Sequence, residues 1–484
     1  MASQMFSCWF LVLFSLCCFH KSFASRITQE DQLQHTHHLV QLTSLLPSST
    51  CTFPLKGSNK RASLQVFHKH GPCSQLKHDK ANANANANAN ANAETHIEIL
   101  KQDQSRVKSI QAKLSERDKL KELDSTSLPA KPGSLLGTGN YFVTLGLGTP
   151  KKYLSLIFDT GSDLTWTQCE PCASSCYNQK DPIFDPSQST SYSNVTCTSA
   201  TCTQLTAATG NDPGCSASTK ACIYAIQYGD SSYSVGYFSE ERLTVSPTDV
   251  FDGFLFGCGQ NNQGLFGGTA GLLGLGRHPI SFVQQTAQKY HKIFSYCLPA
   301  TSSSVGYLTF GGGSSNAVKY TPISTIARGS SFYGIDIIGI TVGTNKLPVS
   351  ASLFSAGGAI IDSGTVITRL PPTAYSSLRD AFRQAMSKYP SAGEVSILDT
   401  CYDLSGYKSF YVPKITFSLK GGVDVELAAD GILYVVSEKQ SCLAFAANED
   451  DGDVTIFGNV QQRTLEVVYD VGAAQIGFGA GGCK

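Results

Sequence analysis

Two aspartates, Asp159 and Asp362, stand in nearly the same local sequence in different halves of the chain. The first copy reads Ile-Phe-Asp-Thr-Gly-Ser and the second Ile-Ile-Asp-Ser-Gly-Thr. β-Branched and aromatic residues favour a buried strand, and the glycine after each aspartate permits a tight turn. The sequence therefore predicts two equivalent sites where a strand ends and presents a carboxyl group.

These two carboxyl groups could act together in acid–base chemistry. A carboxylate at a buried strand end is unfavourable without a partner, whereas two neighbouring carboxyls can share one proton. One then acts as a general acid and the other as a general base on a water molecule, which suffices to hydrolyse an amide. A single Asp-Thr-Gly triplet would be explained by an Asx turn that satisfies its own backbone. Two copies, each followed downstream by an apolar-apolar-Gly element at 272–274 or 456–458, favour catalysis.

On these residues the chain resembles the pepsin-like aspartic proteases over roughly residues 138–484. The resemblance implies a mainly β, bilobal fold with the active site between two duplicated lobes and no metal or organic cofactor. Asp159 and Asp362 would be the catalytic pair, and the shared proton is an established property of such a dyad. Thr160 and Ser363 would brace the two loops, and Ser162 and Thr365 would orient the carboxylates. Gly161 and Gly364 complete the two triplets.

Further residues resemble the nepenthesin-like plant branch of that family. The motif from Tyr141 to Pro150, followed by Asp-Thr-Gly-Ser-Asp-Leu-Thr-Trp, is typical of this branch. In the family Tyr228 would lie on a flap that covers the substrate, and the ring N–H of Trp166 would support it. The alternatives are a surface hairpin with a packed tyrosine, and an ordinary core tryptophan.

Composition indicates a large, mostly β protein. The 484 residues suffice for two or three domains, charged residues make up only 15%, and 44 glycines interrupt short apolar runs. Lys and Arg equal Asp and Glu at 37 each, but residues 1–137 hold 16 of the former and 10 of the latter. The remaining chain is therefore acidic. We expect a signal peptide at 1–24, a pro-segment at 25–137, an N-terminal catalytic lobe at 138–325 and a C-terminal lobe at 326–484.

The amino-terminal region has the features of a secreted precursor. A short apolar run, too short to span a membrane comfortably, ends in Ser22-Phe-Ala24, which suits cleavage by signal peptidase. No Lys or Arg precedes this run. The alternatives to a secretory signal peptide are therefore a plastid-targeting sequence or a membrane anchor. The Ala-Asn repeat that ends at Ala93 is expected to be a spacer, and the whole region has little β character.

An amphipathic helix is predicted after the repeat. Apolar residues at Ile97, Leu100, Val107, Ile110, Leu114 and Leu123 are spaced by three or four in most steps and alternate with Lys and Arg. The helix could be an ordinary solvated one. The functional interpretation is a pro-segment whose cations cover an acidic cleft, lower the pKa of its carboxyl groups and leave in acid. Another helix is predicted from the i, i+4 spacing of Leu378, Phe382 and Met386, after the stretch that begins at Pro371.

Seventeen cysteines fit an oxidising compartment. Three lie in the signal peptide and two, Cys51 and Cys73, in the pro-segment, which leaves twelve. A zinc site is disfavoured because no histidine has ligand spacing. Spacing alone does not fix the pairing. The resemblance implies the bridges Cys169–Cys172, Cys176–Cys258, Cys197–Cys222, Cys202–Cys215, Cys297–Cys483 and Cys401–Cys442.

Together these features predict an acid-active endopeptidase that acts on polypeptides as a monomer. The sequon at Asn194 and the leader favour the secretory pathway, ending in the apoplast or vacuole, without a membrane anchor. One stretch, from Phe256 to Arg277, resembles the chloroplast nucleoid DNA-binding aspartic protease group, so a plastid DNA-associated protease is one alternative. An acidic body attracts phosphate weakly, which disfavours nucleic acid as a partner. The other alternative is an inactive pepsin-like binding protein, such as the xylanase inhibitors.

Overall fold

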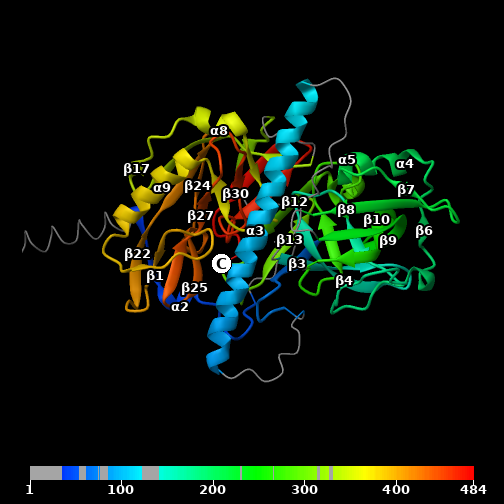
Figure 1. Ribbon diagram of the computed structural model, residues 1–484, viewed down its shortest axis with the longest axis horizontal. Helices are drawn as coiled ribbons and strands as arrows, with labels where there is room; N and C mark the ends of the chain where they lie inside the picture. Colours follow the sequence, from blue (N-terminus) through cyan, green and yellow to red (C-terminus); the bar gives the residue numbers. More distant parts are fainter. Residues whose placement is uncertain are drawn as a thin grey trace, which may run out of the picture.

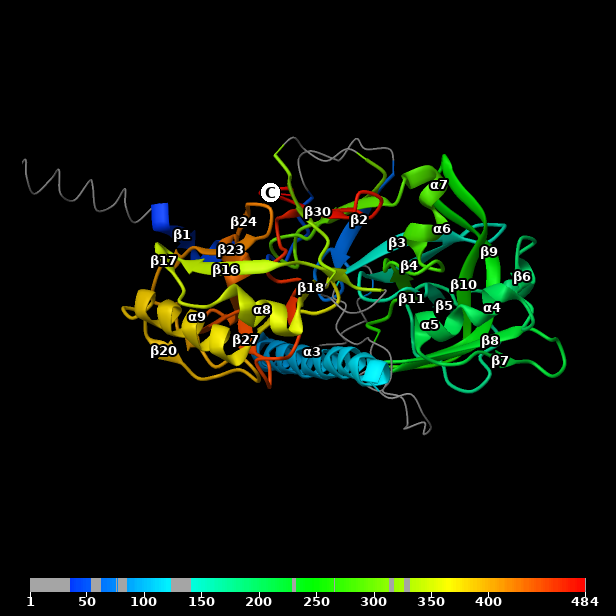
Figure 2. The ribbon, with the colours of Figure 1, turned by 90° about the horizontal axis from the view of Figure 1, so that it is seen from above.

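The protein consists of two β-rich lobes with a long helix across their junction (Figure 1). The computed structural model describes residues 35–53, 62–74, 76, 85–122, 141–228, 232–264, 266–312, 317–325 and 331–483. Helix α3 (Ala85–Glu122) lies on one side of the molecule, along the lobe formed by the later strands (Figure 2). The signal-peptide region, most of the segment between about 120 and 140 where processing is expected, and the flap tip at 229–231 lie outside the described residues. The predicted mainly β, bilobal fold is confirmed.

One sheet forms the first lobe and continues between the lobes. Among the described residues it has 15 strands, most of them antiparallel. Its order is β14 (Lys319–Pro322), β30 (Gln475–Gly479), β29 (Glu466–Asp470), β12 (Ile293–Cys297), β13 (Gly306–Phe310), β2 (Ser63–His68), β3 (Tyr141–Leu147), β4 (Lys152–Asp159), β11 (Gly271–Gly274), β5 (Trp166–Gln168), β10 (Asp249–Gln263), β9 (Tyr233–Ser246), β8 (Cys222–Gln227) and β7 (Gly214–Cys215), with β6 (Ser193–Asn194) beside β9.

The second lobe is built from smaller sheets. In the described part of the chain these are β15 (Tyr333–Gly334), β18 (Ala359–Ile361), β28 (Thr455–Phe457), β19 (Thr368–Leu370) and β27 (Phe445–Ala447); β17 (Asn345–Lys346), β16 (Ile337–Val342), β23 (Ile415–Leu419) and β24 (Val423–Glu426); β20 (Ser391–Ala392), β21 (Cys401–Tyr402), β26 (Gln440–Leu443) and β25 (Leu433–Ser437); and β1 (His37–Gln41) with β22 (Ser409–Pro413).

Helices other than α3 are short and cover sheet faces. The helix predicted from Leu378, Phe382 and Met386 is confirmed as α9 (Pro372–Ala385), which buries Leu378 and Phe382 and has Met386 as its C-cap. The remaining described helices are α2 (Leu42–Leu45), α4 (Ala200–Thr203), α5 (Leu205–Thr209), α6 (Phe282–Gln285), α7 (Ala287–Tyr290), α8 (Ala351–Gly357), α10 (Ala429–Ile432) and the 3-10 helix η1 (Pro186–Gln188).

The expectation of little β structure before residue 130 is wrong, because two strands of this region join the sheets of the lobes. Strand β1 pairs with β22 over five residues, and β2 lies between β13 and β3. Val40 and Val66 are buried in these strands. Most of the Ala-Asn repeat, expected to be a spacer, lies in α3. Alanine is the strongest helix former, so the repeat extends the helix that follows it.

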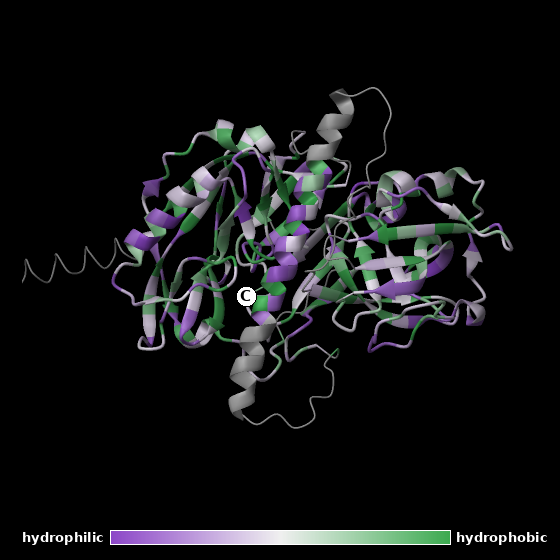
Figure 3. Cartoon of the chain, viewed as in Figure 1, coloured by the Kyte–Doolittle hydropathy of each residue, from purple (hydrophilic) through white to green (hydrophobic). Residues whose placement is uncertain are grey.

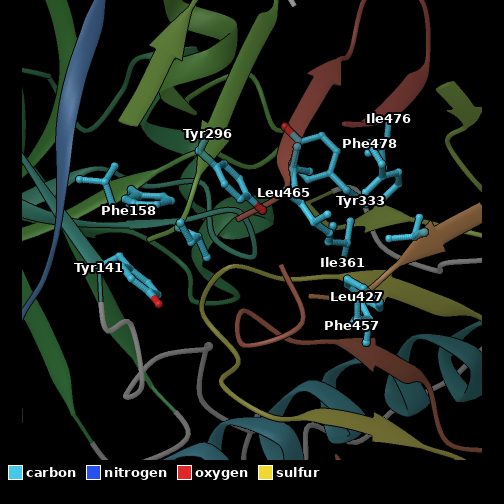
Figure 4. Packing of buried hydrophobic residues seen from close by; sticks show 14 of the residues in the cluster. Tyr141, Phe158, Tyr296, Tyr333, Ile361, Leu427, Phe457, Leu465, Ile476 and Phe478 are labelled. Carbon is cyan, nitrogen blue, oxygen red and sulfur yellow. The ribbon is translucent and has the colours of Figure 1, made fainter. Parts of the chain in front are cut away.

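A continuous core supports both aspartates. Phe158 and Ile361, which precede Asp159 and Asp362, belong to one buried cluster that spans the two lobes (Figure 4). The rings of Phe158 and Tyr296 lie 5.7 Å apart, and Tyr296 also packs beside Tyr469 of the central sheet. The two sites are therefore held by the same packed interior, and not by separately mobile loops.

The stretch from Cys169 to Cys258 is a cysteine-rich insertion. All four disulfides predicted within it are wrong. The chain forms Cys169–Cys258, Cys172–Cys176, Cys197–Cys215 and Cys202–Cys222 in place of the pairs implied by the resemblance. Strand topology explains the difference, because β5 runs parallel to β10 and brings Cys169 beside Cys258. Helix α4 turns the buried Cys202 onto the buried Cys222, which leaves the exposed Cys215 for Cys197.

Outside the insertion, three more disulfides link described residues. Cys297–Cys483 and Cys401–Cys442 are the pairs that the resemblance implies. Cys51–Cys73 closes a loop within the N-terminal region. This third bridge joins two parts of the same segment and does not tether that segment to either lobe.

Candidate active site

Equivalent strand arrangements position the two aspartates. Strand β4 ends at Asp159 and runs parallel to β11, where Gly274 is the partner of Asp159. In the second lobe β18 precedes Asp362 and runs parallel to β28, where Phe457 is the partner of Ile361. The two apolar-apolar-Gly elements of the sequence thus lie on the strands that pair with β4 and β18, which lead to the two aspartates. Each aspartate leaves its strand at the same place in its lobe.

Hydroxyl groups connect the two loops across the lobe junction. The backbone N–H of Thr160 donates to Ser363 Oγ at 3.1 Å, and the N–H of Ser363 donates to Thr160 Oγ1 at 2.9 Å. The hydroxyl of Thr160 also donates to Ser363 Oγ at 3.3 Å. This reciprocal pair fixes the distance between the loops, and therefore between their carboxyl groups.

Each carboxyl group accepts a hydrogen bond from its own turn. Gly161 N–H donates to Asp159 Oδ1 at 3.0 Å, and Gly364 N–H donates to Asp362 Oδ1 at 3.1 Å. A Cβ at Gly161 would lie 2.9 Å from Asp362 Oδ1, and one at Gly364 would lie 2.6 Å from Asp159 Oδ1. Both positions therefore require glycine, because a side chain would separate the two carboxyls.

The outer hydrogen bonds differ between the two loops. Thr365 Oγ1 donates to Asp362 Oδ2 at 2.6 Å. In the part of the chain that the structure describes, the buried Ser162 Oγ has no hydrogen-bond partner. The resemblance implies that Ser162 and Thr365 orient the two carboxylates. In the described residues only Thr365 makes such a contact.

An arginine of helix α3 lies between the two aspartates. Arg106 Nη2 is 2.8 Å from Asp159 Oδ1 and 2.9 Å from Asp362 Oδ1, and its Nε donates to Asp362 Oδ2 at 3.0 Å. The side chains of Arg106, Asp159 and Asp362 are completely buried. In the sequence Arg106 is one of several Lys and Arg residues of the predicted helix, and the pattern does not distinguish it from the others.

A second buried ion pair lies one turn earlier on α3. Asp103 Oδ2 is 2.9 Å from Arg369 Nη2, and both side chains are completely buried. Asp103 and Arg106 fall on the same stripe as Leu100, Val107 and Ile110, which are buried against the lobes. Figure 3 shows hydrophobic and hydrophilic residues alternating along this part of α3. A charged pair at helical spacing within an apolar stripe is the signal that could have identified these residues.

The lysines of the helix lie differently from Arg106. Lys108 Nζ is 3.2 Å from Glu449 Oε1, but its side chain is 62% exposed. Lys113 lies above the ring of Phe332, and Lys101 is exposed. The side chains of Lys119 and Lys121 lie outside the described residues. Of the cations described on this helix, only Arg106 reaches the carboxyl groups of Asp159 and Asp362.

The electrostatic environment raises the pKa of Asp159. Burial is the main cause, and the neighbouring Asp362 adds to it, while the charge of Arg106 acts in the opposite direction. The expectation that cations of the helix would lower this pKa is therefore wrong, because loss of water outweighs one guanidinium. Burial also disfavours the charge of Arg106, but the two carboxylates outweigh it and raise the pKa of Arg106.

The tyrosine and tryptophan singled out in the sequence lie together in the first lobe. Trp166 Nε1 donates to the phenol oxygen of Tyr228 at 2.6 Å, which is the contact that the resemblance implies. Both side chains are buried, and each packs edge-on against Phe266. Burial raises the pKa of Tyr228, so its phenol stays neutral and able to donate.

Other candidate features lie away from this centre. Asn194 is exposed on β6, and its Oδ1 accepts hydrogen bonds from Tyr192 and Ser239. The described residues include no group of three His, Cys, Asp or Glu side chains arranged to hold a metal ion. In the same part of the chain, no helix is long and apolar enough to cross a membrane.

Comparisons with known proteins agree with this geometry. A family model described as xylanase inhibitor N-terminal matches residues 141–312, and one described as xylanase inhibitor C-terminal matches residues 332–480. An aspartyl protease family protein of Arabidopsis thaliana is 58% identical over 453 residues, covering 92% of this chain and 93% of that protein. The aspartyl protease AED1 of Arabidopsis thaliana is 49% identical, covering 92% of each chain. Aspartic proteinase nepenthesin-1 of Nepenthes gracilis is 36% identical, covering 72% of this chain and 79% of its own.

Solved structures with the same fold are more distant in sequence. The crystal structure of edgp matches with a TM-score of 0.57 and 20% identity, covering 70% of this chain and 91% of its own. The basic 7S globulin from soybean matches with a TM-score of 0.56 and 20% identity, covering 70% and 92%. At this identity the two structures support the fold alone.

Proposed function

Since this chain belongs to the pepsin-like aspartic protease family, among plant members that include the nepenthesins, we propose that Asp159 and Asp362 are its catalytic pair. The chain is an aspartic endopeptidase. The proposal adds that it hydrolyses peptide bonds at acid pH, through a water molecule activated by the two carboxyls. The observation that supports this mechanism is the convergence of both carboxyls on one atom, Arg106 Nη2.

We propose that the reacting water binds at the position that Arg106 Nη2 occupies in this structure. A donor at that point is within hydrogen-bonding distance of both inner carboxyl oxygens, so a water there would touch both once Arg106 leaves. One ionised carboxyl takes the proton of the water as it attacks the scissile carbonyl, and the protonated one donates to the carbonyl oxygen. Thr160 and Ser363 hold the two groups at this spacing. Tyr228 would close over the bound peptide.

The described form is latent in this proposal. The guanidinium of Arg106 fills the space that the water and the scissile carbonyl need, and α3 lies over the junction. Residues 25–137 are proposed to be a pro-segment, which is removed by cleavage between about residues 120 and 140. The precursor would be secreted, and the monomeric enzyme that remains after processing would act on polypeptides in the apoplast or vacuole. Nucleic acid has no part in the proposed mechanism.

Digestion of denatured casein by the secreted protein tests the proposal. After incubation in acid, the protein should lose residues before about 140 and then cleave casein at acid pH. Pepstatin, a peptide inhibitor of aspartic proteases, should block both steps. Activity that peaks near pH 8, or resists the inhibitor, would contradict the dyad mechanism. A folded protein that binds polypeptides without cleaving them would support the inactive, inhibitor-like alternative instead.

A further inference from the structure

A pocket for a carboxylate lies beside the catalytic pair. In this structure the side chain of Asp103 fills it: Oδ1 accepts from Val366 N–H at 2.6 Å, and Oδ2 accepts from Ile367 N–H at 3.1 Å. Arg369 Nη2 donates to Oδ2 at 2.9 Å. All three donors belong to the second lobe, in the segment that follows Asp362. Helix α3 supplies only the carboxylate.

The second lobe itself holds Arg369 in place. Its Nη1 donates to the carbonyl oxygen of Ile367 at 2.8 Å, a contact that does not involve α3. Its Nη2 also reaches Gln104 Oε1 of the helix at 3.3 Å. Among the described residues its Nε has no hydrogen-bond partner, and Asp103 is the only carboxylate paired with it. Removal of α3 therefore leaves a guanidinium and two backbone N–H groups without their carboxylate.

We infer that this pocket binds an acidic side chain of the substrate, so that the protease favours peptides with Asp or Glu close to the scissile bond. The inference rests on the proposed function, in which α3 leaves and the dyad hydrolyses the peptide that replaces it. Asp103 occupies, in the latent form, the place of the substrate carboxylate. Three donors around one carboxylate, one of them a guanidinium, discriminate strongly against a neutral amide, whose nitrogen cannot accept a hydrogen bond.

The spacing on α3 sets how far this subsite is from the reaction. Asp103 and Arg106 are three residues apart on one helix face, so their Cβ atoms lie about 5–6 Å apart. An extended peptide advances about 3.3 Å per residue. The acidic residue should therefore lie within about two positions of the scissile bond.

Matched fluorogenic peptides test the inference on the processed enzyme. A cleaved parent peptide with Asn at each of the three positions on either side of the bond is compared with variants carrying one Asp. The assay is run at about pH 5, where a free Asp side chain is ionised. At one position Asp should raise kcat/KM about tenfold over Asn, and Glu should exceed Gln there. Equal cleavage of all pairs would overturn the inference and leave the proposed function intact, whereas no cleavage of any peptide would overturn both.

Variants of the pocket assign the preference to Arg369. Arg369→Gln should reduce the Asp-to-Asn ratio of kcat/KM to about one, and Arg369→Lys should keep part of it. The matched control is Arg383→Gln on α9. The side chain of Arg383 is 46% exposed and lies near Asp399, so this variant should leave the ratio unchanged. A full Asp preference in Arg369→Gln would show that another residue reads the acidic side chain. If Arg369→Gln does not fold, the wild-type peptide pairs still decide whether the preference exists.

Discussion

The N-terminal segment binds the two lobes through two unlike parts. Strands β1 and β2 bind by backbone pairing and by buried valines, Val40 and Val66. Helix α3 binds by an apolar stripe interrupted by two buried ion pairs, Arg106 with the aspartates and Asp103 with Arg369. The helix therefore carries the contact with Asp159 and Asp362, which in our proposal is the inhibitory one, while the strands fix the segment in the sheets.

Most of the described histidines of the N-terminal segment lie on or beside strands β1 and β2. The His68 ring is 5.8 Å from that of His70, and His96 Nδ1, near the start of the described side chains of α3, is 2.8 Å from Tyr434 Oη. Burial lowers the pKa of His68 and of His96, and neighbouring cations lower both further. The charged and titratable groups that face this cluster are Lys69, Arg463, Tyr141 and Tyr434, with Asp430 close to Arg463. The histidine cluster is the set His68, His70 and His96.

The pKa shifts have opposite consequences for docking at the histidine cluster and at the buried carboxyl groups of Asp159 and Asp103. A histidine whose pKa is lowered in the docked state contributes fully above its free value of about 6.5, and docking weakens as pH falls through that value. The raised pKa values of Asp159 and Asp103 act oppositely: their contribution is present below about pH 4 and is lost as pH rises through the raised values. Acid should therefore loosen the segment at the histidine cluster, and not at Asp159 or Asp103.

The largest expected effect is on turnover. Asp159→Asn and Asp362→Asn, introduced into separate chains, should each lower kcat at least about a thousandfold, because Asn cannot exchange the proton. Each variant keeps one carboxylate for Arg106 and all of the strand pairing, so the fold should remain intact by circular dichroism. Casein hydrolysis after removal of the pro-segment by an added protease measures the loss. Activity above about a thousandth of wild type in either variant would argue against the dyad.

The second largest expected effect is a loss of stability in docked α3 that strand β2 does not share. Arg106→Gln leaves two carboxyls buried without their cation, and loss of one partner from a buried pair costs about 3–5 kcal/mol. Amide hydrogen exchange at neutral pH should accelerate about a hundredfold or more in residues 96–114 and by much less in 63–68. The matched control is Lys108→Gln, two positions along the helix, whose exposed pair contributes below about 1 kcal/mol. Equal acceleration in both stretches would mean that the two parts dock as one unit.

A smaller effect concerns pH. His68→Phe keeps an aromatic ring beside Tyr141 but cannot gain a proton, so the segment should stay docked to a lower pH. The pH at which half of the precursor is processed in a fixed time should fall by up to about one unit. His37→Phe, on strand β1 outside the histidine cluster, serves as the control and should leave the midpoint unchanged. A midpoint that does not move in His68→Phe would place the acid response elsewhere.

The sequence predicted the strands and turns around Asp159 and Asp362 better than it predicted how the N-terminal segment contacts the two lobes. The duplicated Asp motifs, the strands that carry them and helix α9 follow from local patterns, because hydrophobic periodicity and turn residues report local structure. Strands β1 and β2 were missed because they are short and gain their stability from edges supplied by distant parts of the chain. The disulfides in the insertion depend on how α4 and β5 pack, which spacing does not encode. Arg106 was visible only as one cation among several.

The smallest expected effect is on the lysines of the helix. Replacing Lys101, Lys108, Lys113, Lys119 and Lys121 with Gln removes five positive charges from α3 and leaves Arg106 in place. The described lysines do not reach the catalytic carboxyls, and exposed pairs contribute about 0–1 kcal/mol each because water and salt screen them. The processing midpoint should therefore move by a few tenths of a pH unit at most, and added salt should abolish that shift. A shift of about one pH unit, as large as the largest expected for His68→Phe in the same assay, would show that long-range attraction to the acidic lobes contributes strongly to holding the helix across the two aspartates.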